Sequence, residues 1–450
     1  MAIEGYDKRS FGEAVSKVVS PAQPIDSVEH LVGRARELEQ IERALMQPGR
    51  NVFIFGERGV GKSSLAATAA TQLQSSDSRY IDVACAQDST LSSVVADIVS
   101  RAVSRSRLTS EVTTTKSGAD LKFISHSIES ERRERDLRTE IRLVTDAIDA
   151  LREVEAIHSD QPVVVIDEVD RIADKKEIDK FGDLLKHIGD KKLGIKFLFT
   201  GVGKTLDEIL GSHQSAIRQL ETIELPRLSW DARWDIAIAA LGHFGIEISR
   251  DICVRLAAVS DGFPYYVHLL VEKILWCLYD EEGESKSVTW DLYVEALREA
   301  ITSIHAELAR PYVEATAYHS PEYEHIVWAT CAGDWQGSNL RTMYGTYESV
   351  AQQLQLSSVL NYNSFCNRLR NLTKTGYGSI LERTRRKGSY QYREKILRGY
   401  VRMQAEANDV IIWGEEARAN VKNYMKSVPS RRTGVPRSQP PSGYPRGWKV

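Results

Sequence analysis

Short apolar runs alternate with amphipathic segments through the first half of the chain. In the amphipathic segments apolar residues recur every three or four positions, which is the period of a helix with one buried face. The apolar runs predict strands that are largely apolar on both faces, within residues 51–55, 80–85, 162–168 and 194–201. Such strands alternating with helices are typical of a doubly wound α/β fold around a parallel sheet.

A longer segment, residues 129–154, has the same helical period. Its apolar residues follow one another at spacings of four, three, four and three; they are Leu137, Ile141, Val144, Ile148 and Leu151. The pattern predicts one long amphipathic helix with a charged outer face. We expect this helix to pack against the core, and a partner-binding surface is the alternative.

The second half of the chain has a different pattern. Beyond residue 226 the strand signals fade and helical periodicity fills residues 229–300, while a hairpin with a polar tip at residues 385–389 is predicted near the end. From Pro429 onward the Pro, Ser and Gly content leaves too little apolar surface to order a tail. We expect five segments: a lead-in (1–27), an α/β domain (28–228), a helical domain (229–300), a C-terminal domain (301–425) and a disordered basic tail (426–450).

The net charge of −3 conceals an uneven distribution. Residues 361–400 carry a net charge of +8 and residues 431–450 carry +5, so the rest of the 450-residue chain carries −16. A basic C-terminal part is typical of proteins that bind a polyanion. A solvated basic face with a solubilising tail is the alternative.

Cysteine use and hydropathy narrow the class of protein. The five cysteines are scattered without a C-x-x-C pair, so neither a disulfide framework nor a zinc site is predicted. We expect a protein of the reducing cytoplasm. No apolar stretch is long enough to predict a membrane span, and the N-terminus does not resemble a signal peptide.

The segment between the apolar run 51–55 and the helix-forming residues after it has the composition of a phosphate-binding loop. Its glycines let backbone N–H groups close around phosphates, and the following helix adds its partial positive charge. Lys62 can reach the terminal phosphates and the Ser63 hydroxyl can hold Mg²⁺. We therefore expect ATP and Mg²⁺ to bind here; an ordinary Gly-rich turn is the alternative. The binding residues are Gly56, Glu57, Arg58, Gly59, Val60, Gly61, Lys62, Ser63 and Ser64.

A second motif supplies the carboxylates that hydrolysis needs. Four apolar residues, 163–166, are followed directly by Asp167 and Glu168. At the end of a buried strand, Asp167 is placed to hold Mg²⁺ beside Ser63, and Glu168 can orient and deprotonate the attacking water. The pattern indicates an ATPase that forms ADP and phosphate. A core strand that ends in surface acids is the alternative.

Two further residues are candidates for contact with the γ-phosphate. Thr200 ends the strand that we expect beside the Asp167 strand, and there it would point at the γ-phosphate unless it only ends the strand in a turn. Arg218 precedes an apolar stretch and could act on a neighbouring subunit's nucleotide as an arginine finger. A structural salt bridge is the alternative for Arg218.

Taken in order, these motifs resemble those of the AAA+ superfamily over about residues 28–300, close to origin-recognition-like initiator ATPases and to STAND signalling NTPases. The series is Val32-Gly33-Arg34, the phosphate loop, Asp167-Glu168, Thr200, Arg218 and Gly262-Phe263-Pro264. The resemblance implies an αβα nucleotide domain with a helical lid, and it places Val32 and Gly33 near the adenine.

The lid departs from the initiator pattern at one position. Where initiator-type lids carry an arginine shortly after the glycine, this chain has Tyr265. The Gly-x-Pro sequence resembles the STAND form, which implies that Pro264 lies near the base. The resemblance therefore leaves two modes open, a nucleotide-operated switch and a cycling motor.

Residues 356–375 predict a helix–turn–helix. Its expected buried set is Leu356, Val359, Phe365, Leu369 and Leu372. Asn and Arg on the exposed face are the residue types that recognise adenine and guanine edges in a major groove, and we expect DNA contacts from Asn367, Arg368 and Asn371. The hairpin behind it resembles the wing of a winged helix, with a basic tip at Arg385, Arg386 and Lys387. An internal regulatory role for this domain is the alternative.

Together these features predict an AAA+ ATPase that couples nucleotide state to homo-oligomerisation and to binding of double-stranded DNA. A STAND-like signalling or defence switch, with a regulatory winged helix, is the second hypothesis. A transposon-type AAA+ regulator that acts through a protein partner is the third.

Overall fold

The computed structural model describes residues 3–412, except for positions 4, 22 and 28 and residues 75–77, 106–136, 213–217, 282–285 and 334–336. The chain divides into two compact units. The sheet unit is Gln23–Pro226, and the helical unit joins Met1–Ala22 to Arg227–Val450. The expected tail, residues 426–450, lies outside the described residues, and the expected domain limits stay a prediction.

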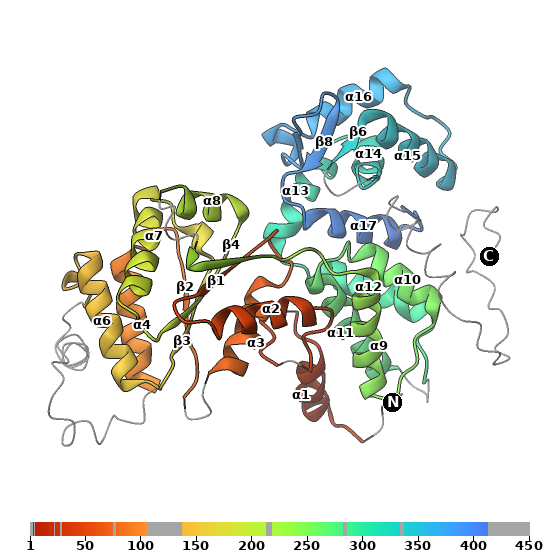
Figure 1. Ribbon diagram of the computed structural model, residues 1–450. Helices are drawn as coiled ribbons and strands as arrows, with labels where there is room; N and C mark the ends of the chain where they lie inside the picture. Colours follow the sequence, from red (N-terminus) through yellow and green to blue (C-terminus); the bar gives the residue numbers. More distant parts are fainter. Residues whose placement is uncertain are drawn as a thin grey trace. The chain divides into compact units, whose positions relative to one another are not determined.

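The sheet unit is built on five strands, all parallel, in the order β2-β3-β4-β1-β5 (Figure 1). This confirms the doubly wound parallel sheet. The central strands are buried on both faces, as their uninterrupted apolar sequences require. The strands are β1 (Asn51–Phe55), β2 (Ile81–Ala84), β3 (Val163–Asp167), β4 (Lys196–Gly201) and β5 (Leu220–Glu224).

Helices cover both faces of this sheet (Figure 1). One face packs against α2 (Ala35–Leu45) and α3 (Lys62–Leu73). The other face presents a core that includes Phe53, Phe197 and Phe199. The helices over that second face are α4 (Leu91–Arg105), α6 (Val144–Ile157), α7 (Lys175–Asp190) and α8 (Gly203–Ser212). Burial of each phenylalanine stabilises the fold by about 2 kcal/mol, so the packing fixes the positions of the strand ends that carry the site.

The long helix expected over residues 129–154 is shorter than predicted. Residues 129–136 lie outside the described part of the chain, Leu137–Thr139 is a short 3-10 turn, and α6 begins only at Val144. The cause is a local helix start. The Asp146 carboxylate accepts hydrogen bonds from the N–H groups of Arg142 (3.0 Å) and Leu143 (2.9 Å), which commits these donors outside the helix.

Four helices follow Arg227 in the helical unit. They are α9 (Trp230–His243), α10 (Arg250–Val259), α11 (Pro264–Asp280) and α12 (Trp290–Ser303). Side-chain oxygens of Ser229, Ser249 and Thr289 cap three of them, and α11 instead begins with Pro264. The lead-in adds α1 (Lys8–Val18), whose Phe11 stacks on Tyr279 with ring centroids 4.4 Å apart. This helix of the lead-in packs on the α9–α12 bundle, where Phe11 also contacts Phe244 and Trp276.

The C-terminal part of this unit combines helices with a small antiparallel sheet, in the order β6-β8-β7. The predicted hairpin is confirmed by the pairing of Arg383 with Tyr390. The strands are β6 (Ser338–Asn339), β7 (Leu381–Arg383) and β8 (Ser389–Tyr392). The helices are α13 (Ala306–Thr316), α14 (Glu322–Ala329), α15 (Leu340–Gln353), α16 (Tyr362–Asn371) and α17 (Leu397–Ala407).

The predicted helix–turn–helix starts earlier than residue 356. Its first helix is α15, residues 356–361 form the connection, and Val359 is 49% exposed rather than buried. The second helix starts at Tyr362 because the Asn361 side chain accepts a hydrogen bond from the Ser364 N–H at 2.9 Å. Phe365, Leu369 and Leu372 are buried as expected. Within the described part of the chain, no helix is long and apolar enough to cross a membrane.

Helix α17 joins the C-terminal part to α9–α12 through buried charges. It contacts α10 and α12 on one side and α13 and α14 on the other (Figure 1). Asp261, in the turn before α11, lies 2.6 Å from an Nη atom of Arg227, 3.0 Å from one of Arg402 and 3.7 Å from one of Arg398. A second buried pair joins Arg255 on α10 to Glu406 on α17. Because the two α17 arginines also donate to the carbonyl of Cys331 beyond α14, these contacts hold the two parts together.

We expect Asp261→Asn to destabilise the helical unit strongly. Burial tends to raise the pKa of Asp261, but the surrounding guanidinium charges lower it to about 2. Removal of the carboxylate leaves buried arginines without their counter-charge, which costs about 3–5 kcal/mol in free energy of unfolding. All eight tryptophans follow residue 229, so fluorescence-detected urea unfolding reports this unit. The exposed Asp280→Asn is the control, with a change below about 0.5 kcal/mol.

The pH dependence of this difference tests its electrostatic origin. Because the folded-state pKa lies below the unfolded value of about 3.9, the carboxylate stabilises the fold fully above about pH 5 and loses this effect as pH falls toward 2. The difference in free energy of unfolding between wild type and Asp261→Asn should therefore narrow below about pH 4. A gap that is absent, or that stays constant down to the lowest pH at which the protein folds, would contradict the assignment.

Candidate active site

The loop between β1 and α3 has a backbone that only glycine can adopt at several positions. Gly59 and Gly61 have φ of +82° and +97°, in the left-handed region. A Cβ at Gly56 would lie 2.5 Å from the Leu225 carbonyl oxygen. The loop therefore turns tightly at the carboxyl edge of the sheet and leads into α3, which begins at Lys62. This is the geometry of a phosphate cradle at a helix N-terminus.

Lys62 lies inside this loop. Its Nζ donates to the carbonyl oxygens of Gly56 (3.2 Å) and Glu57 (2.9 Å). Burial lowers the pKa of Lys62, while the nearby carboxylates of Asp170 and Asp167 oppose the shift. The Lys62 ammonium is hydrogen-bonded to backbone carbonyls and lies near several carboxylates. It can therefore turn to phosphate oxygens with little change in the loop.

Asp167, Glu168 and Thr200 form one hydrogen-bonded group at the ends of β3 and β4. The buried Thr200 hydroxyl donates to the Asp167 carboxylate, and the same hydroxyl accepts from the Glu168 N–H at 3.1 Å. The Glu168 N–H also lies 3.0 Å from Asp167 Oδ1. Thr200 thus fixes the orientation of Asp167, while its predicted contact with the γ-phosphate stays a prediction.

Glu168 leaves the sheet in an unusual conformation. Its φ is +56°, and its carboxylate accepts a hydrogen bond from Arg171 at 2.9 Å. The left-handed residue starts the short turn Val169–Arg171, which brings Asp170 to within 3.3 Å of Arg58 in the phosphate loop. Asp170 and Arg171 were not predicted as site residues. The sequence feature that could have indicated Asp170 is its place as a third acid close behind Asp167 and Glu168.

The residues expected to hold Mg²⁺ fit a hard cation in their chemistry. A hydroxyl and a carboxylate, from Ser63 and Asp167, are oxygen donors of the kind that Mg²⁺ takes together with water and phosphate oxygens. The Ser64 hydroxyl has another partner, since it accepts from the Ile25 N–H at 3.1 Å. Ser63 and Asp167 therefore remain the predicted pair, and Ser64 links the loop helix to the segment before α2.

The segment expected near the adenine also contacts the phosphate loop. Gly33 has φ of +74°, and the buried Arg34 donates to the carbonyl oxygens of Val60 (3.0 Å) and Pro226 (2.7 Å). Val32 and Gly33 are thereby held beside the loop. Pro264 belongs to the helical unit, where it is the first residue of α11. Base contacts of Val32, Gly33 and Pro264 stay predictions.

Arg218 lies at the opposite edge of the sheet from the phosphate loop. It is exposed and lies two residues before Leu220, where β5 begins, and the carboxyl end of β5 leads back to Leu225 beside Gly56. In a parallel sheet the start of one strand and the end of its neighbour lie at opposite edges. Any action of Arg218 on a phosphate would therefore be on a second copy of the chain.

The predicted DNA-contacting residues lie on α16 and at the tip of the β7–β8 hairpin. Asn367, Arg385, Arg386 and Lys387 are exposed, and Arg368 is half-buried. Asn371 is engaged at both ends of its amide. Its Nδ2 donates to the Tyr323 hydroxyl at 2.8 Å, and its Oδ1 accepts from Lys374 at 2.8 Å.

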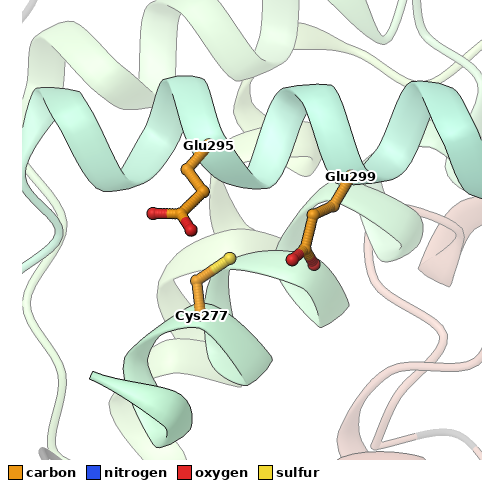
Figure 2. A group of neighbouring side chains, drawn as sticks. All are labelled: Cys277, Glu295 and Glu299. Atoms are coloured by element: carbon orange, nitrogen blue, oxygen red, sulfur yellow. The ribbon is translucent and has the colours of Figure 1, made fainter. Parts of the chain in front are cut away.

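One further group in the described part of the chain brings metal-type ligands together. Figure 2 shows the Cys277 thiol of α11 facing Glu295 and Glu299 of α12, with the three ligand atoms within 4.8 Å of one another. Burial, together with the charges of the two glutamates, raises the pKa of Cys277 to about 12. The thiol is therefore protonated at neutral pH, and we interpret the group as a contact between the two helices.

Comparison with known proteins agrees with this geometry. Residues 30–192 match the family described as the AAA ATPase domain, while no curated protein matches the chain. A Walker-type ATPase of Pyrococcus abyssi is structurally similar, with a TM-score of 0.53 and 14% identity over 85% of this chain and 99% of that one. The ORC2 protein of Aeropyrum pernix aligns over 91% of this chain and 100% of its own, with a TM-score of 0.46 and 15% identity. At such identities the similarity to the first structure shows a common fold.

We expect Thr200→Ala to weaken the use of Mg²⁺ rather than the binding of nucleotide. Without its hydroxyl donor Asp167 loses its orientation, and loss of such a supporting contact typically costs 10- to 100-fold in metal affinity. The Mg²⁺ concentration for half-maximal ATP turnover should rise by about that factor, and Thr200→Ser should restore it to within about threefold. A fall in maximal turnover with an unchanged Mg²⁺ requirement would instead assign Thr200 to the phosphate.

Proposed function

We propose that this chain, an AAA+ P-loop ATPase, couples the state of its nucleotide to assembly of a homo-oligomer and to binding of double-stranded DNA. The observation that carries the DNA part is the order of α15, α16 and the β7–β8 hairpin, with three exposed cations at the hairpin tip. Two helices followed by a basic hairpin form the arrangement of a winged helix. Such domains place the second helix in the major groove and the hairpin on phosphates.

Hydrolysis uses the group at the carboxyl edge of the sheet. Lys62 leaves the loop carbonyls for the β- and γ-phosphate oxygens, and Glu168 leaves Arg171 to orient the attacking water. Ser63 and Asp167 would hold Mg²⁺, which would supply further charge neutralisation at the phosphates. As the new oxygen–phosphorus bond forms, the bond to the bridging oxygen breaks and ADP carries the leaving charge. Glu168 accepts the water proton, which passes to solvent or to the released phosphate.

In DNA binding, the exposure of the side chains along α16 distinguishes residues that contact bases from residues that position the helix. Asn367 and Arg370 lie on the exposed face, where an amide and a guanidinium can recognise adenine and guanine edges. Asn371 holds α16 against Tyr323 of α14, so we assign it to positioning of the helix. Arg368, which is half-buried, is proposed as a phosphate contact. The wing residues Arg385, Arg386 and Lys387 would add sequence-independent affinity.

Assembly is supported by the position of Arg218. Because this arginine lies at the edge of the sheet away from its own phosphate loop, an arrangement in which it contacts a neighbour's γ-phosphate requires an oligomer. ATP would then favour assembly, since the γ-phosphate completes the contact between subunits.

A second candidate function is a nucleotide-operated switch in which the C-terminal domain regulates the ATPase. The specific observation in its favour is the buried network of Asp261, Arg398 and Arg402, which joins the turn before Pro264 to α17. Such a link would transmit a change at the lid to the winged helix in either function. A protein partner would then take the place of DNA.

We also propose that the protein works in the cytoplasm. All five cysteines are buried free thiols, which a reducing compartment preserves. Cysteine reactivity gives the expected check: thiol titration of the folded protein should find little reaction, and titration in urea should find all five.

Substitution of the wing tip tests the DNA function. In the triple variant Arg385→Ala, Arg386→Ala, Lys387→Ala, affinity for a generic duplex should fall, and the slope of log affinity against log salt should flatten by about 2–3, because about 0.9 counterion is released per phosphate contact. The measurement is fluorescence anisotropy of a labelled duplex over a series of salt concentrations.

The matched control removes three exposed cations from α1, in the variant Lys8→Ala, Arg9→Ala, Lys17→Ala, and should leave the slope unchanged. An equal effect of both triple variants would indicate that duplex affinity depends only on the net charge of the protein. Binding that is absent or insensitive to salt in the wild type would contradict the DNA function and favour the switch.

A further inference from the structure

The phosphate loop carries a second cation beside Lys62. Arg58 lies at the apex of the loop, between Gly56 and Gly59, and its Nη2 is 3.3 Å from Asp170 Oδ2. The arginine side chain is 64% exposed and the aspartate only 10% exposed. The Asp170 carboxylate is thus held inside the fold, while the Arg58 guanidinium extends into solvent.

The position of Asp170 is fixed by the backbone around it. Val169 is buried, and the left-handed Glu168 turns the chain back, so that Asp170 faces the end of β4 near Gly201. Asp170 also opposes the effect of burial on Lys62 more strongly than any other acid. One carboxylate therefore lies close to both cations of the loop, and all three groups lie at the edge where the phosphates are expected.

Arg58 has room to move. Together with Asp170, Val202 and Lys204 it lines an open cleft of about 270 Å³ next to the loop. The guanidinium is largely exposed to water, which screens its attraction to Asp170, so this contact can be exchanged for a contact with phosphate at small cost. A guanidinium also offers a planar pair of N–H donors that matches two phosphate oxygens, which an ammonium does not.

We propose that Arg58 is a catalytic residue that stabilises the charge on the terminal phosphate during transfer, within its own subunit, and that Asp170 positions it. When the bond between the γ-phosphorus and the bridging oxygen breaks, negative charge grows on that oxygen and on the γ-oxygens. A guanidinium aimed at these oxygens lowers the barrier more than it strengthens binding of the ground state. The proposal rests on the ATPase activity and is independent of DNA binding.

The test compares binding of ADP with binding of ADP–aluminium fluoride, which mimics the phosphate in flight, together with single-turnover hydrolysis. Arg58→Ala should leave the ADP dissociation constant within about threefold. It should weaken binding of the mimic and slow hydrolysis by a similar factor, about 100- to 1,000-fold. Arg58→Lys should lie between wild type and Arg58→Ala. Asp170→Asn should weaken mimic binding more than ADP binding.

Two controls separate the role from structural effects. Arg101, whose exposed pair with Asp82 spans 3.0 Å on the same unit, is the matched arginine, and Arg101→Ala should change none of these values. Equal loss of ADP and mimic affinity in Arg58→Ala would overturn the proposal, because it would indicate damage to the loop. Unchanged hydrolysis in that variant would overturn it as well.

Subunit mixing tests whether Arg58 acts within its own subunit. Lys62→Ala retains Arg58 but lacks the lysine for ATP hydrolysis, and Arg58→Ala retains Lys62. Mixtures of the two should show no more turnover than the separate variants. Restored turnover would mean that Arg58 acts on a neighbour and would overturn the assignment. Failure of the DNA function would change none of these results.

Discussion

The nucleotide site depends on the register of the parallel strands, which aligns their carboxyl ends at one edge of the sheet. Phe55 of β1 pairs with Gly201 of β4, and Ala84 of β2 pairs with Asp167 of β3. Because parallel strands end at one edge, this register brings the phosphate loop, the two acids of β3 and the Thr200 hydroxyl together without any long-range loop. The apolar strands hold the register, since a slip by one residue would move each side chain of a strand to the opposite face of the sheet, where the packing partners differ.

A second constraint governs the helical unit. The carboxylate of Asp261 is surrounded by arginines from the start of the unit and from α17, so the turn before α11 and the C-terminal domain share one buried charge cluster. Breaking such a cluster is costly, which favours movement of these parts as one body. The same connection would serve a DNA-binding ATPase and a regulated switch.

Much of this architecture could be predicted from the sequence, and the failures have physical causes. The parallel sheet with a phosphate loop at its carboxyl edge is confirmed, because glycine spacing and apolar strands express local requirements of the backbone. The predicted start of α6 was wrong, because hydrogen bonds to the Asp146 side chain start the helix at Val144 although the apolar period begins earlier. The first helix of the helix–turn–helix was misplaced because Val359 looked like a core residue. The contacts of Arg58, Asp170 and Arg171 could not be predicted, since they depend on the left-handed Glu168.

The proposed function requires that the nucleotide bound at this edge controls DNA binding through the helical unit. The most direct measurement is the affinity of Glu168→Gln for duplex DNA with ATP and with ADP, by anisotropy, alongside light-scattering mass at the same concentrations. The variant retains the phosphate loop and loses the water-activating carboxylate, so it should bind ATP without turnover. We predict at least a tenfold difference in DNA affinity between the two nucleotides, together with a larger mass in ATP. Equal affinities and masses in both nucleotides, or hydrolysis as fast as wild type, would contradict the account.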